Sequence, residues 1–379
     1  MASHVGLSLA RILVVNAGSS SLKLRVLDDA DAVVAGADLP PPRGPEDRPA
    51  VSAAVATLGG VDAVGHRIVH GGTAFLGPVR LDERVTARIS ALTSLAPLHQ
   101  PKALAALAAV TAAIPDVPAV ASFDTAFHAQ MPEAAATYAI PAPWRQRWDL
   151  RRYGFHGLSH AYATRRASEL LGVAAAELRL VTCHLGAGAS LAAVQGGRSV
   201  DTTMGFTPLE GLVMATRSGS VDPGLVLWLA DHVGMPPAEL AATLEHRSGL
   251  LGLAGTADMR EILAGAETGE ARARLALGVY LHRLRREIAA MTASLGGLDA
   301  IVFTGGVGER SAPIRAMAAD GLAYLGIRID PARNDAAGAG DREIGAAGAP
   351  VRVLVIESRE DVQIAGDVRS VLGAAAPAT

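Results

Sequence analysis

The sequence predicts an α/β protein made of two similar lobes that face a cleft, and three observations support this fold class. Its 379 residues favour two domains, at about 150 residues per domain. Short runs of β-branched residues alternate with alanine-rich helical stretches, which is typical of α/β architecture. A pattern of strand, small-residue turn and strand begins around Asn16 and recurs around His184, which indicates a duplicated chain whose ligands bind between the lobes.

The predicted strands end in turns of glycine and serine. Residues 11–15 form a β-branched run, 16–21 a polar turn, and 22–26 an alternating stretch, so we expect a hairpin. The same interpretation applies to residues 179–183, 184–190 and 191–194. A third strand, residues 300–303, leads into a glycine turn over 304–309 and then a helix, with Ser311 as its N-cap and Pro313 in its first turn.

Helices are predicted over residues 83–95, 102–114, 159–171 and 271–295. The last carries one apolar stripe that steps by three and four residues and stops at a glycine pair, which we interpret as core or subunit interface. The stripe consists of Leu277, Leu281, Leu284, Ile288, Met291 and Leu295. Residues 40–45 and 336–349 lack periodicity and are expected to be loops.

Composition and charge restrict the class of partner. The net charge of −3 and the lack of a basic block argue against nucleic acid or an anionic membrane as the main partner, so we expect a small ligand. No uncharged apolar run reaches the ~18 residues of a membrane helix, and residues 5–15 lack the flanks of a signal peptide. A single cysteine, Cys183, excludes an internal disulfide framework and suits a reducing compartment. The expected location is the cytoplasm.

Two common enzyme classes are excluded by missing motifs. The chain has two lysines, Lys23 and Lys102, and neither follows a glycine, so the P-loop pattern is absent. The G-x-S-x-G nucleophile elbow is absent as well.

The two hairpin turns are candidate phosphate sites. Both offer small residues, backbone N–H groups and hydroxyls, from Ser19, Ser20 and Ser21 in the first and Ser190 in the second. Either turn alone could be an ordinary serine-rich loop, but two related copies favour a phosphate chain. Lys23 follows the first turn and either reaches a phosphate or stays a solvated strand lysine.

Two arginines are candidates for binding an anion. Arg67 ends an apolar strand beside His66, His70 and a glycine pair, although a surface arginine is the usual outcome at such a place. Arg217 lies within a long stretch of low charge rich in glycine, proline and methionine. A desolvated guanidinium there would need an anionic partner.

Histidines and acids complete the candidates. His156 and His160 are spaced like a zinc pair, but Gly157 between them and the missing glutamate speak against metal, and packed histidines that form hydrogen bonds are the alternative. Asp124 follows an apolar strand, and Glu360 follows another at residues 353–356. Each acid could also cap a helix.

These motifs together resemble the acetokinase family, within the superfamily of acetate and sugar kinases, Hsp70 and actin, from Ile12 to about Gly366. The matching blocks are residues 16–23, 65–72, 96–101, 123–128, 153–156, the Arg217 segment and 303–309. The resemblance implies two duplicated ribonuclease H-like or actin-like lobes around a central cleft. It also implies an N-terminal lobe of residues 1–126 plus a returning helix at 361–379, and a nucleotide-binding, dimer-forming lobe at 127–360.

The resemblance implies roles for individual residues. Arg67, Asp124, His156, His184 and Arg217 would be catalytic, and Arg67, Val69, Leu98, Pro208 and Arg217 would bind the carboxylate substrate. Ser19 and Ser21 would contact phosphate, and Asn16 and Glu360 would hold Mg²⁺ or Mn²⁺. The nucleotide, ATP or ADP, would contact Lys23, His184, Gly186, Gly188, Ser190, Asp258, Met259, Arg260, Gly306, Val307, Gly308, Glu309 and Arg310. The family also implies a homodimer.

Several positions depart from the family pattern. Ala187, Arg310 and Arg359 stand where the family usually has asparagine, and Met259 replaces an aromatic residue near the adenine. At Ala187 the phosphates lose one side-chain amide, so that contact would rest on backbone N–H groups. The choice of nucleotide base is therefore less constrained than the reaction type.

The implied reaction suits these residue types. A carboxylate is ionised at pH 7, since its reference pKa is near ~4, and needs no general base to attack ATP. We therefore expect reversible in-line transfer between ATP and acetate, giving acetyl phosphate and ADP without a phosphoenzyme. Propionate is the nearest alternative substrate, because one CH₂ changes binding by only about 0.8 kcal/mol. An ATPase module like actin or Hsp70 and a sugar kinase remain as other interpretations.

Overall fold

The structure is a computed structural model that describes residues 9–18, 21–42, 44–97, 99–336 and 340–373. It divides into two compact units. The first unit comprises Met1–Ala129, Gly157–Tyr162 and Arg359–Thr379, and the second comprises Gln130–His156 and Ala163–Ser358. This division counts residues 127–129, 157–162 and 359–360 with the first unit, whereas the family-based boundaries counted them with the second.

A six-stranded mixed sheet in the order β3-β2-β1-β4-β6-β5 forms the centre of the first unit. Strands β1, β2 and β3 form an antiparallel meander, whereas β1, β4 and β6 run parallel. The strands are β1 (Ile12–Ala17), β2 (Leu22–Leu27), β3 (Val33–Leu39), β4 (Ala63–Ile68), β5 (Val79–Arg80) and β6 (Ala119–Phe123). The predicted first hairpin is confirmed by the pairing of β1 with β2.

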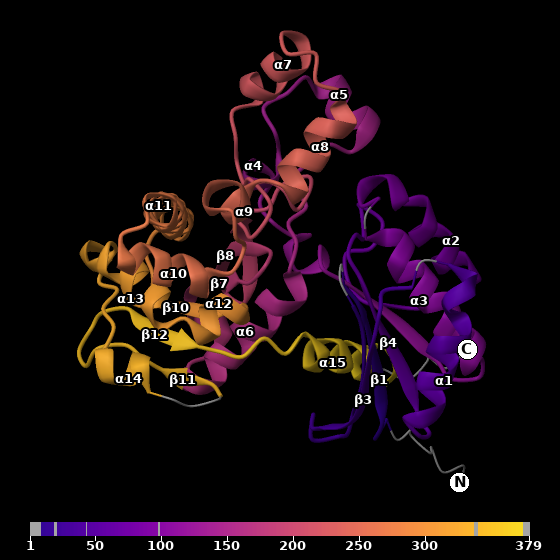
Figure 1. The fold of residues 1–379 in the computed structure, drawn as a ribbon. Coiled ribbons are helices and arrows are strands. Elements are labelled where there is room, and N and C mark those ends of the chain that lie inside the picture. The colour runs from indigo at the N-terminus through magenta and orange to yellow at the C-terminus, as the bar shows by residue number, and fades with distance from the viewer. Residues whose placement is uncertain (1–8, 19–20, 43, 98, 337–339, 374–379) are drawn as a thin grey trace. The chain divides into compact units, whose positions relative to one another are not determined.

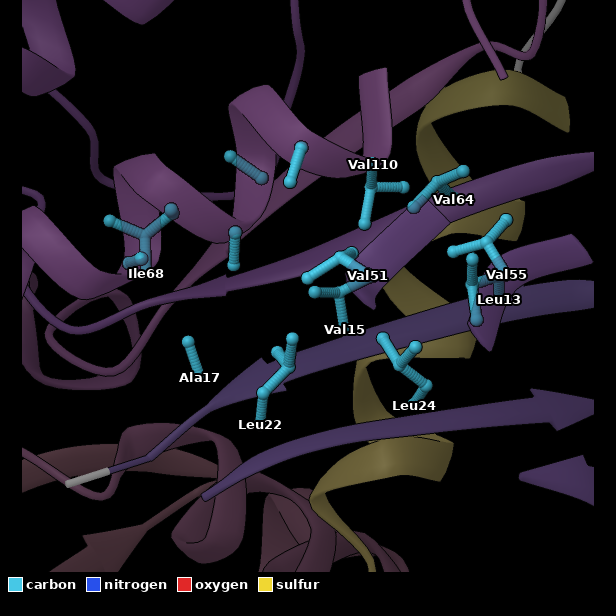
Figure 2. Packing of buried hydrophobic residues seen from close by; sticks show 14 of the residues in the cluster. Leu13, Val15, Ala17, Leu22, Leu24, Val51, Val55, Val64, Ile68 and Val110 are labelled. Atoms are coloured by element: carbon cyan, nitrogen blue, oxygen red, sulfur yellow. The ribbon is translucent and has the colours of Figure 1, made fainter. Parts of the chain in front are cut away.

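Helices cover both faces of this sheet, because its central strands carry apolar side chains on each side. One face packs against α1 (Arg48–Thr57), α2 (Glu83–Ala91) and α3 (Gln100–Ala113). Figure 2 shows this layer, in which Leu13 and Leu24 from strands lie near Val51, Val55 and Val110 from helices. The opposite face packs against α15 (Glu360–Gly373) and the first residues of α6 (Gly157–Leu171).

The second unit has a sheet in the order β11-β12-β10-β7-β8-β9. Strands β7, β8 and β9 form an antiparallel meander, and β7, β10 and β12 run parallel. The strands are β7 (Arg179–Leu185), β8 (Ala189–Gln195), β9 (Arg198–Thr202), β10 (Ala300–Thr304), β11 (Arg342–Glu343) and β12 (Arg352–Val355). Cys183 lies fully buried on β7, and burial raises the pKa of its thiol.

The two sheets have the same topology, which confirms the predicted duplication and the α/β class. Each places a three-strand antiparallel meander beside two further parallel strands and ends on a short antiparallel strand next to the last of them. Strand β1 therefore corresponds to β7, β4 to β10, and β6 to β12. Residues at the ends of these strands in one unit have topological counterparts in the other.

The helices of the second unit include the longest in the chain, α11, which packs across β7, β8 and β9 (Figure 1). Besides the rest of α6, they are α4 (Glu133–Ala136), α5 (Ala142–Trp148), α7 (Pro223–Asp231), α8 (Pro237–His246), α9 (Gly249–Ala254), α10 (Met259–Thr268), α11 (Ala271–Leu295), α12 (Gly305–Arg310), α13 (Ala312–Asp320) and α14 (Pro331–Asp335). Short 3₁₀ turns occur in both units. Those of the first unit are at Pro45–Asp47, Thr93–Leu95 and Ala126–His128, and those of the second are at Ala175–Glu177 and Ala323–Leu325. Across the described ranges, no helix has the length and apolar content of a membrane span.

Most predicted elements are confirmed, with corrections at their ends. The stripe on α11 is core for all its members except Leu277, which is half-buried. The predicted glycine turn at 304–309 is instead a short helix, α12, because Gly305 takes a positive φ of 76° and starts a helical turn directly after β10. Ser311 does precede α13, but its hydroxyl makes no capping hydrogen bond. The predicted loop at 336–349 contains strand β11.

Candidate functional site

In the first unit, polar side chains gather at the carboxyl ends of the parallel strands. Asn16 lies near the end of β1, Arg67 near the end of β4, and Asp124 directly after β6. Glu360 begins α15. Because parallel strands end at one edge of a sheet, four segments distant in sequence deliver these groups to one place.

Arg67 is the centre of this first-unit cluster. Its guanidinium donates to both oxygens of Asp124, Nε to Oδ1 at 3.0 Å and Nη2 to Oδ2 at 2.5 Å. Nη1 donates to Asn16 Oδ1 at 3.1 Å, and the Asn16 amide donates to Glu360 Oε2 at 3.3 Å. Glu360 Oε2 lies 3.7 Å from Arg67 Nε. Such a bidentate pair fixes the arginine's orientation as well as its charge.

The charges of this cluster are coupled. Burial opposes the charge on Arg67, but the carboxylates of Asp124 and Glu360 outweigh it and raise the pKa of the guanidinium. Burial raises the pKa of Asp124 to about 6, with Arg67 acting in the opposite direction. His66 and His70, on and beside the same strand, have pKa values lowered to about 4 by burial, so they are neutral at pH 7.

The other first-unit candidates lie near this edge without joining the hydrogen bonds. Val69 follows β4 and is 5% exposed, so it is part of an apolar wall. Lys23 is exposed and pairs in register with Asn16 across the hairpin. Ser21 closes the hairpin turn by accepting from Gly18 N through its carbonyl at 2.8 Å. Ser19 and Leu98 lie outside the described residues.

In the second unit, two stacked histidines lie beside the corresponding hairpin, His184 near the end of β7 and His156 directly before α6. The rings of His156 and His184 lie 4.4 Å apart between centroids. His156 Nδ1 is 2.9 Å from Ser190 Oγ, and the residue has a positive φ of 57°. A Cβ on Gly188 would come within 3.3 Å of the His156 ring and 3.5 Å of Arg217 Nη1, so glycine allows a close approach of backbone to both side chains.

Arg217 is half-buried and lacks an ion pair among the residues that the structure describes. Its Nη1 donates to Pro208 O at 3.4 Å and lies 4.0 Å from Met214 Sδ. Burial lowers the pKa of Arg217, with the Glu245 carboxylate acting in the opposite direction. A guanidinium whose hydrogen-bond partners are neutral is suited to an anionic ligand.

A large pocket opens beside this turn, entirely within the second unit. Its volume is about 930 Å³, enough for a nucleotide. Its lining includes seven predicted nucleotide contacts, Gly186, Asp258, Met259, Arg260, Gly306, Val307 and Arg310, together with Ala187. Asp258 accepts from the backbone N–H of Arg260 and forms an ion pair with its guanidinium, so the two residues hold the start of α10 in place. The carbonyl of exposed Ala187 accepts from Ala215 N at 3.1 Å.

The lining does not include six of the predicted nucleotide residues: Lys23, His184, Gly188, Ser190, Gly308 and Glu309. Glu309 accepts from the backbone N–H of Ser358 at 2.9 Å. Gly308 is buried, and its carbonyl accepts from Arg315 Nη1 at 2.9 Å. Arg359, where the family has asparagine, pairs with Asp361 in the first unit.

Sequence reasoning missed Arg315 and Tyr280. Arg315 is 1% exposed and holds α12 by donating to the carbonyls of Gly308 and Glu309. Burial lowers its pKa to about 10. Arg315 lies three residues before buried Ala318 in α13, and this helical spacing could have indicated that Arg315 is on the buried face. Tyr280 lines the pocket from α11, one position away from the stripe that drew attention to that helix.

Comparisons with known proteins identify the family of this chain. A family model described as the acetokinase family matches residues 51–366. The chain belongs to the acetokinase family. Acetate kinase from Shouchella clausii is 42% identical over 95% of this chain and 98% of its own, and acetate kinase from Leifsonia xyli is 46% identical over 94% and 98%.

Solved structures of acetokinase relatives agree with the fold. Acetate kinase from Porphyromonas gingivalis superposes with a TM-score of 0.89 at 35% identity, over 96% of this chain and all of that chain. A propionate kinase from Francisella tularensis superposes with a TM-score of 0.87 at 34% identity, over the same shares. Both an acetate and a propionate enzyme therefore share this acetokinase architecture.

Proposed function

We propose that this chain is an ATP-dependent acetate kinase, which transfers the γ-phosphoryl group of ATP reversibly to acetate and gives acetyl phosphate and ADP. The observation that carries the proposal is the first-unit cluster, in which Arg67 is fixed by Asp124, Asn16 and Glu360. Membership of the acetokinase family supports the same reaction.

Electrostatics explain why such groups would suffice. Acetate is already an anion, so the obstacle to attack on ATP is repulsion between negative charges. Two unit charges ~4 Å apart interact by roughly 4 kcal/mol at an effective dielectric of about 20, so one well-placed cation could change the rate by about a thousandfold. Arg67 and Arg217 would bind the carboxylate and the transferred phosphoryl group and stabilise the charge that develops during transfer.

The oxygen donors of the first-unit cluster fit a magnesium ion. Asn16, Asp124 and Glu360 supply amide and carboxylate oxygens, the ligands that Mg²⁺ and Mn²⁺ prefer. Mg²⁺ is commonly held by one or two carboxylates together with phosphates and water, so these protein ligands would be sufficient. When bound, the ion would neutralise phosphate charge. Asp124 would orient Arg67 rather than act as a base.

The second unit would bind the nucleotide. The 930 Å³ pocket offers the backbone of Gly186 and Gly306 to the phosphates and Met259 to the base. His156 would donate to a phosphoryl oxygen, as the family resemblance implies, and its contacts with Ser190 and His184 would orient the ring. Lys23, Ser19, Ser21 and the backbone at Gly188 would make further phosphate contacts.

Propionate is the second candidate substrate, because a propionate kinase shares the architecture. Val69 and Pro208 would form the wall against the acyl tail, together with Leu98. One CH₂ is worth about 0.8 kcal/mol, so either acid could be preferred by a small margin.

A hydroxamate assay with ATP tests the proposal. Product that forms with acetate, propionate or butyrate and depends on Mg²⁺ is the expected result, and the rates rank the three acids. ADP release that is independent of any carboxylate would contradict the proposal and favour an ATPase module. Phosphorylation of glucose or glycerol instead would favour a sugar kinase.

We further propose a cytoplasmic homodimer. The second unit exposes large apolar side chains on α5 and α7, with Trp144 54% and Leu227 64% exposed. Their burial against a second copy would remove apolar area from water. Light scattering on the wild type and on Leu227→Glu tests this: a dimer that the substitution weakens is expected, and a monomeric wild type would contradict it.

A further inference from the structure

The segment that carries Pro208 and Arg217 has no regular secondary structure between β9 and α7, so its conformation depends on individual hydrogen bonds. A partly buried polar network fixes its first half. Glu210 accepts from Tyr138 Oη through Oε2 at 2.7 Å and from Arg152 Nη2 through Oε1 at 2.6 Å. One carboxylate therefore joins two other segments of the second unit.

The partners of Glu210 also hold the backbone of this segment directly. Tyr138 Oη accepts from Phe206 N at 2.9 Å. Arg152 Nη1 donates to the carbonyls of Thr203 at 3.2 Å and Met204 at 3.0 Å. The turn at residues 206–210 is thus tied at both ends, at Phe206 through Tyr138 and at Glu210 through both side chains.

Gly205 shows how closely the network packs. A Cβ at this position would collide with Glu210 Oε2 and with the Tyr138 hydroxyl. Gly205 O meanwhile accepts from Tyr153 N at 3.0 Å. Packing of this kind restricts the conformations open to the 206–210 turn.

The 206–210 turn also sets the position of Arg217. Pro208 lies between the two tied positions, and its carbonyl accepts from Arg217 Nη1 at 3.4 Å. A shift of Glu210 would therefore move both the Pro208 ring and the carbonyl oxygen to which that guanidinium donates.

We propose that Glu210, clamped by Tyr138 and Arg152, is a positioning residue that sets Pro208 and Arg217 for the carboxylate substrate. This inference rests on the proposed function and deepens it. Glu210 touches no reacting atom and acts through the 206–210 turn. Its loss changes how the enzyme binds and selects carboxylates, while the nucleotide pocket keeps its shape, because neither Glu210 nor its two partners line that pocket.

The test uses Tyr138→Phe, Glu210→Gln and Glu210→Ala in the full chain. Removing the tyrosine hydroxyl takes away one of the two hydrogen bonds to Glu210 and the bond from Phe206 N, so we expect KM for acetate to rise about fivefold in Tyr138→Phe. The order of increasing effect is Tyr138→Phe, Glu210→Gln, Glu210→Ala, because Gln keeps one acceptor oxygen and Ala keeps none. KM for ATP stays within about twofold, and the ratio of acetate to propionate turnover changes as the Pro208 wall moves.

Tyr153→Phe is the matched control. It also removes a partly buried tyrosine hydroxyl, but that hydroxyl donates to Asp149 O at 2.8 Å rather than to the turn. We expect its KM for acetate to be unchanged.

The outcomes separate the two proposals. A wild type without carboxylate-dependent turnover contradicts the proposed function. An active wild type whose variants lose kcat alone, with both KM values and the substrate ratio unchanged, overturns the role of Glu210, because this is the signature of a merely destabilised fold. If Glu210→Ala does not fold, Tyr138→Phe decides the question, since it removes a single oxygen atom.

Discussion

The two sheets share one topology but differ in the groups at the ends of their equivalent strands. Strands β1 and β4 lead to Asn16 and Arg67, whereas β7 and β10 lead to a glycine-containing turn and the short helix α12. The first unit thus presents charged side chains held in place by hydrogen bonds. The second presents backbone that other groups can approach closely, beside a pocket. The comparison teaches that a duplicated scaffold sets where strand ends fall, while a few side chains at those ends decide the chemistry.

The largest expected effect comes from removing either arginine. Arg67→Ala and Arg217→Ala should each lower kcat by ~10² or more, because each would stabilise transition-state charge. Steady-state kinetics measure this. Arg25→Ala in the first unit and Arg247→Ala in the second serve as controls, since these arginines bind Asp38 and Thr243. Near-normal kinetics in both active-site variants would rule out the assignment.

The next effect concerns Asp124 and pH. Burial raises the pKa of this carboxyl to about 6, so it is ionised above that pH and protonated below it. Protonation loosens its hold on Arg67, and kcat/KM should therefore fall about tenfold per pH unit below that range. The Asp124→Asn variant should have a lower kcat/KM at every pH and should not show this decrease at low pH. The hypothesis fails if kcat/KM of the variant decreases at low pH in the same way as that of the wild type.

Ala187→Asn tests the phosphate turn of the second unit. Ala187 is exposed at the pocket, so an asparagine could donate one additional hydrogen bond to the nucleotide. A net gain of about 1 kcal/mol would lower KM for ATP about fivefold without changing KM for acetate. Isothermal titration with ADP measures the binding directly. Unchanged affinity would mean that the backbone alone makes this contact.

The smallest expected effect comes from Val69→Ala in the first unit. The smaller side chain should leave more space for the acyl tail and favour propionate over acetate by about fourfold, which corresponds to the ~0.8 kcal/mol of one buried CH₂. Competition between the two acids measures the ratio. The matched change Val64→Ala, within β4 and in the core layer rather than after the strand like Val69, should leave the ratio as it is.

Much of the fold could be predicted from the sequence, because hairpins and helices are local patterns. The pairs 11–15 with 22–26 and 179–183 with 191–194 both form, and the helix over 271–295 has those bounds. The glycine-rich segment at 304–309 was misread, since glycine suits a turn and a tight helical start equally well.

The site was harder to predict because it depends on distant contacts. Arg67 and Asp124 stood out as residues, but their bidentate pairing required the parallel register of β4 and β6. Arg315 and Glu210 gave no strong sequence signal. The first is a charge inside an apolar helix face, and the second is one glutamate in a segment without periodicity.

Cys183, buried in β7, has a practical consequence for studying the motion of this molecule. It is 0% exposed, and burial raises the pKa of its thiol, so maleimide reagents will find little thiolate there. Fluorophores would therefore attach selectively to cysteines introduced at exposed positions of either unit, with the natural thiol left in place.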